Sequence, residues 1–212
     1  VVHLPALNVR VLRRIGDEVW AGTDGGIGVF TLDATPVRQY RPADGLPSAP
    51  ITDIVTGVNG QVWVSSEGNG IARRNADGTW TGFAAPAAGN NFLSNQVRAL
   101  AHDGANLWVG TAAGLSIFSE ASSTFVFPVT TQGGQLPDIR VNDLALANGS
   151  VFVATPQGVA VRSPANQWST LRRATGGWPS STGSDFARTI AHDGTHLWIA
   201  LADSARQPKG AL

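Results

Sequence analysis

The chain has 212 residues, with 15 lysines and arginines against 15 aspartates and glutamates, so its formal net charge is zero. A neutral chain lacks the excess of one sign that nucleic-acid binding and polybasic attachment to membranes require. Its hydrophobic content of 42% argues against disorder over the whole length. The absence of cysteine excludes disulfides, thiolate metal sites and cysteine nucleophiles. No apolar run approaches the ~18 residues of a membrane span, so we expect no membrane insertion by this chain.

A motif built around an aromatic residue recurs five times. The segments are EVWAGT, QVWVSS, NLWVGT, SVFVAT and HLWIAL, and their aromatics are Trp20, Trp63, Trp108, Phe152 and Trp198. Successive aromatics are 43, 45, 44 and 46 residues apart. A second matching element precedes four of them: LPAL at 4, LPSA at 46, LSNQ at 93 and LPDI at 136. The chain therefore consists of repeats of nearly constant length, which is typical of a modular fold.

Each repeat is predicted to contain short strands. The first two strands are separated by a pair of residues that tolerates the positive φ of a tight hairpin: Gly16-Asp17, Asn59-Gly60, Asp103-Gly104, Asn148-Gly149 and Asp193-Gly194. In the first four repeats a third apolar strand follows, at Ile27–Phe30, Ile71–Arg73, Leu115–Phe118 and Val159–Val161. A fourth strand then carries an aromatic: Tyr40, Trp80 with Phe83, Phe125 with Phe127, or Trp168. No segment has sustained helical periodicity, which excludes a helical solenoid.

Four short antiparallel strands per repeat are typical of a blade, so the predicted fold is an all-β propeller. Blades are expected at about 4–45, 46–91, 92–134 and 135–176, with an incomplete fifth at 177–212. The fifth repeat ends about where its third strand should begin, which gives roughly four and a half blades. We expect further blades or another chain to complete a larger ring, because exposed blade edges favour aggregation. The recurring aromatics are expected to be buried in equivalent places between blades rather than to form a glycan-stacking array.

The repeats resemble a known family. Residues 91–118, NFLSNQVRALAHDGANLWVGTAAGLSIF, and residues 45–74, GLPSAPITDIVTGVNGQVWVSSEGNGIARR, resemble the two-component regulator propeller repeat. The resemblance implies a β-propeller of the kind found in extracytoplasmic sensor regions and in secreted and surface proteins. It also implies that the hairpins between first and second strands lie on the face opposite the usual binding face.

Two histidines, His102 and His192, recur in the sequence AHDG. A histidine beside an aspartate can serve as a proton shuttle or a metal ligand. Both lie next to a predicted hairpin turn, however, where aspartate is a common turn residue. We therefore expect that replacing either histidine by alanine leaves any function intact. The chain has no calcium-loop ladder of aspartates, no phosphate-binding loop and no Gly-x-Ser-x-Gly elbow, so no metal, cofactor or catalytic residue is predicted.

Candidate ligand-binding residues lie in the long connections 84–94, 129–139 and 174–186 and in the turns after the second strands. Polar amides beside an occasional exposed aromatic suit sugar or peptide recognition, although solvated loops are polar by default. The candidates are Asp24, Glu67, Asn69, Asn90, Asn91, Gln132, Gln135, Gln157, Trp178 and Asp203.

These features favour a non-enzymatic recognition or scaffolding module that binds a protein or a glycan. The resemblance implies an extracytoplasmic location: periplasmic, cell-surface or secreted. One alternative is the ligand-sensing ectodomain of a two-component-type sensor. Another is a propeller lyase or glycan hydrolase, which needs converging carboxylates or a histidine at the central axis. The repeated first-strand carboxylates are Asp53 and Asp143, which we interpret as structural unless both face the axis with perturbed pKa values.

Overall fold

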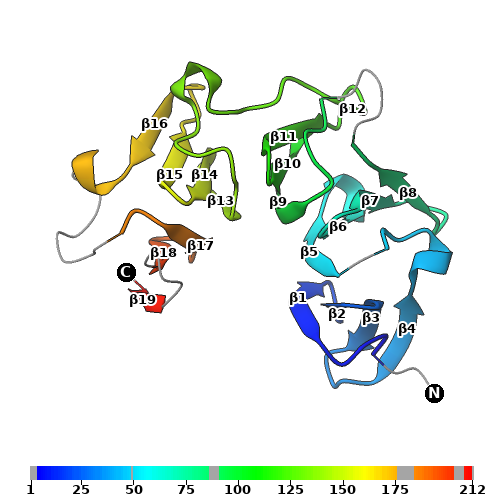
Figure 1. Ribbon diagram of the computed structural model, residues 1–212. Coiled ribbons are helices and arrows are strands. Elements are labelled where there is room, and N and C mark those ends of the chain that lie inside the picture. Colours follow the sequence, from blue (N-terminus) through cyan, green and yellow to red (C-terminus); the bar gives the residue numbers. More distant parts are fainter. Residues whose placement is uncertain (1–3, 49, 86–90, 176–183, 203–207, 212) are drawn as a thin grey trace.

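The computed structural model describes residues 4–48, 50–85, 91–175, 184–202 and 208–211. Five antiparallel sheets stand side by side on an arc, each forming one blade, with the first strand of each blade nearest the centre (Figure 1). The arc is open between the fifth and first blades, so the described residues form a partial ring. The prediction of an all-β propeller is confirmed.

The strands of each blade are hydrogen-bonded in chain order. The first blade contains β1 (Val9–Ile15), β2 (Glu18–Thr23), β3 (Gly26–Thr31) and β4 (Pro36–Tyr40). The second contains β5 (Ile51–Thr56), β6 (Val62–Ser66), β7 (Gly70–Arg74) and β8 (Trp80–Phe83), and the third contains β9 (Val97–His102), β10 (Asn106–Thr111), β11 (Gly114–Ser119) and β12 (Thr124–Phe125). The fourth contains β13 (Asp143–Ala147), β14 (Ser150–Thr155), β15 (Gly158–Arg162) and β16 (Trp168–Leu171), and the fifth contains β17 (Ala187–His192), β18 (Leu197–Ala202) and β19 (Pro208–Ala211).

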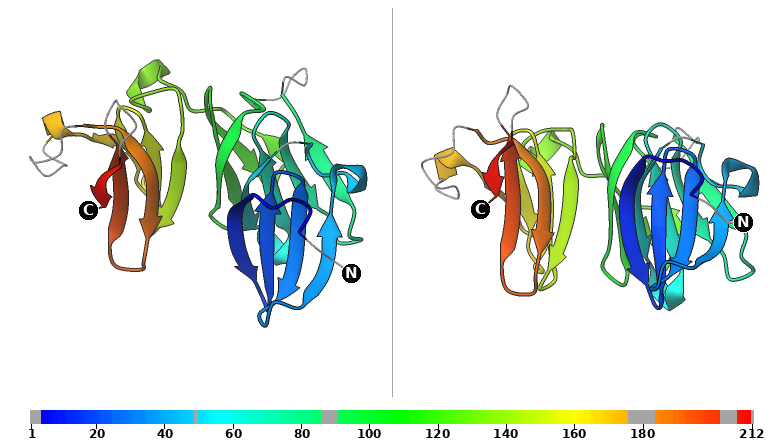
Figure 2. Two further views of the ribbon diagram at one scale, coloured as in Figure 1. Left: turned by 60° about the horizontal axis from the view of Figure 1, so that its bottom comes forward. Right: turned by 90° about the horizontal axis from the view of Figure 1, so that it is seen from below.

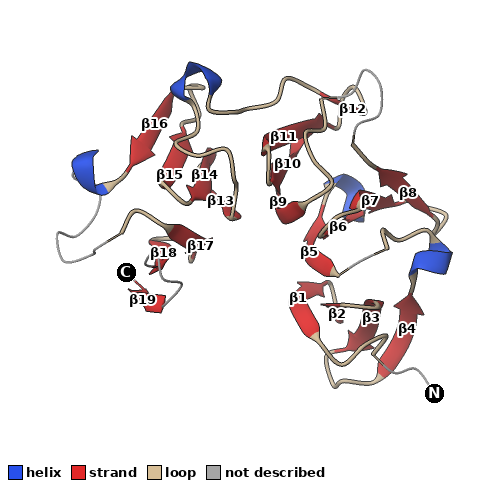
Figure 3. Ribbon diagram, viewed as in Figure 1, coloured by secondary structure: helices blue, strands red, loops and turns tan. Residues whose placement is uncertain are grey.

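Short 3-10 helices lie in the connections outside the sheets, as Figure 3 shows. They are η1 (Pro42–Asp44), η2 (Val58–Gly60), η3 (Gln132–Gly134) and η4 (Arg173–Thr175). Seen from the side in Figure 2, the strands of the blades run roughly along one common direction. Among the described residues, no helix has the length and apolar character needed to cross a membrane.

Glycine allows consecutive blades to approach closely. A Cβ atom on Gly22 of β2 would lie 2.7 Å from Cγ2 of Ile51, and one on Gly110 of β10 would lie 2.6 Å from Cγ1 of Val141. Ordinary carbon contacts need about 3.5 Å or more, so a side chain at either position would push the next first strand away. In the first and third blades, where the sequence reads WxGT, this glycine thus sets the spacing to the next blade.

The recurring tryptophans fill the interfaces between consecutive blades. Trp20, Trp63 and Trp108 are each at most 2% exposed. Trp20 belongs to an apolar cluster with Ile51 of the second blade, and Trp108 belongs to a cluster with Val141 at the start of the fourth. Each indole is therefore buried against the blade that follows it, which confirms the packing prediction for these three residues.

The prediction of equivalent burial is wrong for the last two aromatics. Trp198 is 46% exposed. In the earlier blades this position is covered by the next blade, and the described residues contain no sixth sheet that could cover Trp198. Phe152 is half-buried against the fifth blade. Trp63 is covered by Phe118 of the next blade and by Phe83 of its own β8. Phe118 belongs to the third strand of its blade, β11, whereas the third strand of the fifth blade, β19, has no aromatic residue to cover Phe152.

The predicted ending of the fifth repeat is also corrected. Pro208–Ala211 forms a third strand, β19, which pairs with β18 through Ala200 opposite Ala211 and Ala202 opposite Pro208. The outer edge of β18 is therefore partly paired, and the described fifth blade lacks one strand rather than two. Tertiary pairing overrides the weak strand propensity of proline and glycine in this segment.

Candidate functional site at the centre of the arc

The first strands of all five blades line one cavity of about 570 Å³, here called the axial cavity. Its lining consists of Arg10, Val11, Leu12, Arg13, Thr52, Asp53, Arg98, Asn142, Asp143, Arg188 and Thr189. All of these side chains except Val11 and Leu12 are polar. A smaller cavity of about 290 Å³ lies at the hairpin ends of the same strands, where His102 and Arg14 are among its lining residues.

Side chains at one equivalent position at the start of the first strands alternate from blade to blade; it is the second residue of β1, β5, β9 and β17 and the residue directly before β13. The first, third and fifth blades place Arg10, Arg98 and Arg188 there, whereas the second and fourth place Thr52 and Asn142. The Thr52 hydroxyl donates to the carbonyl oxygen of Val97 at 2.9 Å, and the Asn142 amide donates to that of Ala187 at 2.8 Å. The neutral residues therefore join their blade to the next one, while the arginines belong to the lining of the cavity.

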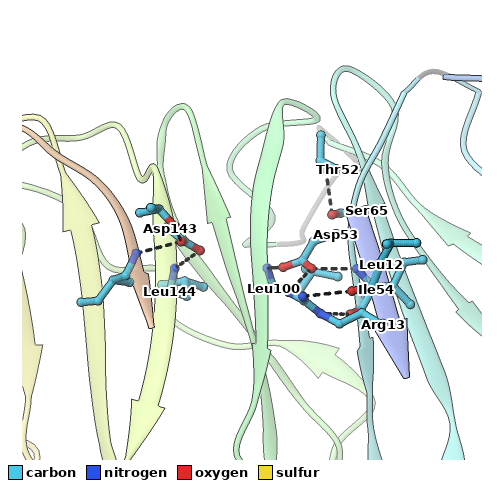
Figure 4. A network of polar contacts seen from close by, with 11 residues as sticks. Leu12, Arg13, Thr52, Asp53, Ile54, Ser65, Leu100, Asp143 and Leu144 are labelled. Carbon is cyan, nitrogen blue, oxygen red and sulfur yellow. Dashed lines mark hydrogen bonds and ion pairs between the residues drawn. The ribbon is translucent and has the colours of Figure 1, made fainter. Parts of the chain in front are cut away.

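Asp53 joins the second blade to the third (Figure 4). Its carboxylate accepts hydrogen bonds from the backbone N–H of Ile54 at 2.8 Å and of Leu100 at 2.9 Å. It also accepts one from Nη2 of Arg13 at 2.9 Å. The Asp53 side chain is 8% exposed, and this burial raises its pKa above the ordinary value. The nearby negative charge of Asp143 adds to the rise.

Asp143 plays the same part between the fourth and fifth blades. Its carboxylate accepts from the backbone N–H of Leu144 at 2.8 Å and of Ile190 at 2.9 Å, and from the hydroxyl of Thr189. Both repeated carboxylates thus line the axial cavity, as an enzyme with paired acids would require. Every oxygen of the pair is nevertheless engaged by a protein donor, which supports the structural interpretation.

Two predicted site residues lie together beside the axial cavity. Asp24 accepts hydrogen bonds from Nε of Arg10 and, at 2.7 Å, from the amide of Asn8. The hydrogen bond from Arg10 lowers the pKa of Asp24. A carboxylate oxygen of Glu67 lies 3.9 Å from Nη1 of the same arginine. Arg10 therefore has acidic neighbours from both the first and second blades.

The other predicted site residues are dispersed. Asn69 donates to the Ser48 carbonyl, Asn91 donates to that of Phe125 at 3.3 Å, and Gln157 donates to Asp138 at 3.2 Å. Gln132 is in η3 and Gln135 follows it. The side chains with described partners stabilise separate loops. Asn90, Trp178 and Asp203 lie outside the described residues.

A shallower hollow of about 390 Å³ lies at the turn after β6 and the connection before β9. Its lining includes Gly68, Ala85 and residues 93–96. This hollow overlaps the connection 84–94 that the sequence singled out as a binding loop. All of its lining residues are uncharged.

The cavity arginines were missed in the sequence. The signal was present: Arg10 and Arg98 each follow a valine at the start of a repeat, and Arg188 follows Ala187 at the same place. This alternation is less conspicuous in the sequence than the recurring aromatics and the polar loops. The repeat spacing locates such residues only once the first strands are known to face a common axis.

The two recurrent histidines lie in different environments. Nδ1 of His102 accepts a hydrogen bond from the backbone N–H of Gly104 at 3.0 Å, so Nε2 carries the proton and donates to Glu120 at 3.0 Å. The same carboxylate accepts from the indole N–H of Trp63 at 3.3 Å. The His102 side chain is only 4% exposed. Among the described contacts, His192 repeats the bond to its turn, from Gly194 at 3.1 Å, without a carboxylate partner.

We expect His102→Ala to destabilise the chain by about 2 kcal/mol, because it leaves a nearly buried glutamate with fewer donors. The matched variant His192→Ala should cost under about 1 kcal/mol, since only an exposed turn loses a contact. Urea unfolding followed by tryptophan fluorescence measures both values. Equal losses in the two variants would contradict the structural role of His102, and neither variant should change ligand binding.

The recurrent aspartates are turn residues, as predicted. Asp193 accepts from the backbone N–H of Thr195 and His196 and from the indole N–H of Trp198, at 2.9, 2.7 and 2.8 Å. These hydrogen bonds lower its pKa to about 2, with the bond from His196 contributing most. Within the described part of the chain, no group of three or more histidines and carboxylates is placed to hold a metal ion.

No protein-family model and no curated protein matches the chain. Among solved structures, it is similar to the extracellular domain of a hybrid two-component system of B. thetaiotaomicron, at 21% identity and a TM-score of 0.74 over 98% of this chain and 28% of that one. It is similar to PorZ, a surface component of the type-IX secretion system of Porphyromonas gingivalis, at 14% identity and 0.66 over 97% and 28%. It is also similar to a virginiamycin B lyase from Staphylococcus aureus, at 18% identity and 0.54 over 93% and 79%.

The chain thus spans little more than a quarter of the length of the first two structures. At these identities the likeness shows a shared β-propeller fold. The fold shared with the extracellular domain of a two-component system agrees with the β-propeller implied by the resemblance of the repeats to the two-component regulator propeller repeat.

Proposed function

We propose that this chain is a non-enzymatic recognition module that binds its ligand in the axial cavity. The observation that carries the proposal is the convergence of polar side chains from all five first strands on one cavity of about 570 Å³. Ligand sites are typically concave, with volumes of roughly 300–1,000 Å³ and a few convergent polar groups. Of the predicted loop residues, Asp24 and Glu67 take part in this proposed site, because they flank the cavity residue Arg10.

The solved neighbours support an extracytoplasmic location for this module, whether periplasmic, cell-surface or secreted. One is an extracellular domain of a two-component system, and another is a bacterial surface component. Scaffolding within a larger propeller is compatible with the exposed face around Trp198. The similarity to a two-component ectodomain also favours a second candidate function, in which ligand binding to the module is the input of a sensor.

The engagement of Asp53 and Asp143 supports binding without catalysis. A general acid or base must reach the substrate with a free oxygen or proton. Here the oxygens of both carboxylates accept hydrogen bonds from backbone or side-chain donors of neighbouring blades. The fold shared with a lyase makes turnover of the bound ligand the rival outcome.

The test is a cavity-filling substitution. Leu12 lines the axial cavity and is 58% exposed, whereas Leu32 is 53% exposed just after β3, outside the cavity lining. Leu12→Trp should fill the cavity, and Leu32→Trp is the matched control. Binding is measured by calorimetry against acidic and neutral oligosaccharides and an acidic peptide, with product analysis after long incubation.

We expect Leu12→Trp to weaken binding of the recognised probe more than tenfold and Leu32→Trp to leave it within about twofold. Equal affinities of the two variants for that probe would overturn the axial site, and so would the absence of binding to every probe. Conversion of the probe by the unmodified chain would overturn the non-enzymatic proposal.

A further inference from the structure

The residues that line the axial cavity carry an excess of positive charge, although Asp24 and Glu67 lie against Arg10 beside the cavity. Its lining carries four arginines, Arg10, Arg13, Arg98 and Arg188, against the two aspartates Asp53 and Asp143. The chain as a whole is neutral and only 14% of its residues are charged, so this is a local concentration rather than a general property of the surface. Like charges around one cavity repel each other, and an anion in the cavity would offset that repulsion.

The arginines differ in whether a carboxylate of the protein already neutralises their charge. Arg13 forms an ion pair with Asp53 at 2.9 Å, and Arg10 is paired with Asp24. Arg98 donates from Nη1 to the neutral amide oxygen of Asn142 at 3.2 Å, which holds its guanidinium without cancelling the charge. Within the described residues, Arg188 makes no side-chain hydrogen bond or ion pair. Neither Arg98 nor Arg188 has a carboxylate partner in the described part of the chain.

Neutral hydrogen-bonding groups lie between these cations. Thr52 and Asn142 occupy the equivalent positions of the intervening blades, and Thr189 adds a hydroxyl beside Arg188. Only Val11 and Leu12 are apolar, so the cavity offers little of the apolar contact on which peptide side chains depend. The hydroxyls of Thr52 and Thr189 already donate to Val97 and Asp143, so they offer a ligand acceptor oxygens, to which the hydroxyl groups of a sugar can donate.

We propose that the axial cavity recognises an acidic saccharide, with Arg98 and Arg188 binding its carboxylate or sulfate groups. This inference rests on the proposed function and specifies its ligand class. Guanidinium groups present paired donors that match the geometry of carboxylate and sulfate oxygens. Arg10, which already pairs with Asp24, contributes less.

The test compares Arg98→Gln and Arg188→Gln with Arg41→Gln, an exposed position outside the cavity lining that removes the same charge. The probes are a sulfated oligosaccharide, an oligogalacturonate, a neutral oligosaccharide of matched length and oligoglutamate. Calorimetry of the whole chain is carried out at low and at high salt, because screening weakens exposed ionic contacts. The two acidic saccharides separate sulfate from carboxylate recognition.

We expect an acidic saccharide to bind more tightly than the neutral one, with each cavity substitution weakening it about five- to tenfold. The control should stay within about twofold, and high salt should weaken binding to the unmodified chain. Equal binding of the neutral oligosaccharide, lost in Leu12→Trp but kept in both cavity arginine variants, would overturn this inference and leave the proposed function standing. Tighter binding of oligoglutamate would overturn the saccharide class. Binding that is insensitive to Leu12→Trp would overturn both proposals.

Discussion

Replacing Trp108 by alanine should lower the free energy of unfolding by about 3–5 kcal/mol, the usual cost of removing a large buried aromatic. Its indole is 2% exposed and packs in the cluster that joins the third blade to the fourth. The substitution removes this contact and also leaves Asp103 without the indole N–H that donates to it at 2.7 Å. Because each interface holds neighbouring blades together, the loss should reduce the stability of the whole arc.

The matched control is Trp198→Ala, at the equivalent position of the fifth blade. Trp198 makes the same hydrogen bond, to Asp193 at 2.8 Å, but it is 46% exposed. Its removal should therefore cost about 1 kcal/mol or less. Urea titrations followed by far-ultraviolet circular dichroism compare the two. Similar losses in both variants would mean that the position acts through its hydrogen bond rather than through burial between blades.

Replacing Asp53 by alanine should cost about 3 kcal/mol. The substitution leaves the N–H groups of Ile54 and Leu100 without their acceptor and removes the ion pair with Arg13. The control is Asp17→Ala, whose side chain is 97% exposed and lies 3.8 Å from Arg14, and which should cost under about 1 kcal/mol. A loss at Asp53 no larger than at Asp17 would show that the second and third blades associate without this carboxylate.

The pH dependence of the Asp53→Asn variant gives a second readout of the same site. Burial raises the pKa of Asp53 above its ordinary value of 3.8, so the folded chain binds this proton more tightly than the unfolded chain. The resulting stabilisation is complete below 3.8 and is lost as the pH rises through the folded-state pKa. The stability of the unmodified chain relative to Asp53→Asn should therefore fall as the pH increases above about 3.8. A gain in the stability of the unmodified chain relative to Asp53→Asn over this pH interval would show that the hydrogen bonds to Asp53 lower its pKa more than burial raises it.

The repeat pattern predicted the fold because packing between blades needs the same residue types at the same places. The aromatic spacing located the second strands, and pairs such as Asn148-Gly149, with φ values of 49° and 74°, marked the hairpins. Trp198 shows where this reasoning fails: its sequence context matches that of Trp108, but burial depends on a following blade. The third strand of the fifth repeat was expected to begin about where the repeat ends, and β19 lies there and pairs with β18, which the strand pattern of the sequence left incomplete.

The candidate site was less predictable because it belongs to several repeats at once. Asp53 and Asp143 were recognised as a repeated pair, and their hydrogen bonds across blade interfaces match the structural interpretation. The three arginines at the second position of alternate blades are 88 and 90 residues apart, and only the curvature of the arc brings them to one cavity. The predicted loop residues stay predictions; of those described, Asn69, Asn91 and Gln157 bond to neighbouring segments.

The most direct measurement of the axial site is side-chain nuclear magnetic resonance of the arginine Nε–Hε groups during titration with the acidic oligosaccharide that binds best. Arg98 and Arg188 line the axial cavity, whereas Arg41 and Arg162 lie outside its lining and serve as internal references. We expect the resonances of Arg98 and Arg188 to shift with the binding isotherm while those of the references stay in place. Shifts confined to the backbone of residues 93–96, in the hollow before β9, with both cavity arginines unchanged, would contradict the axial site.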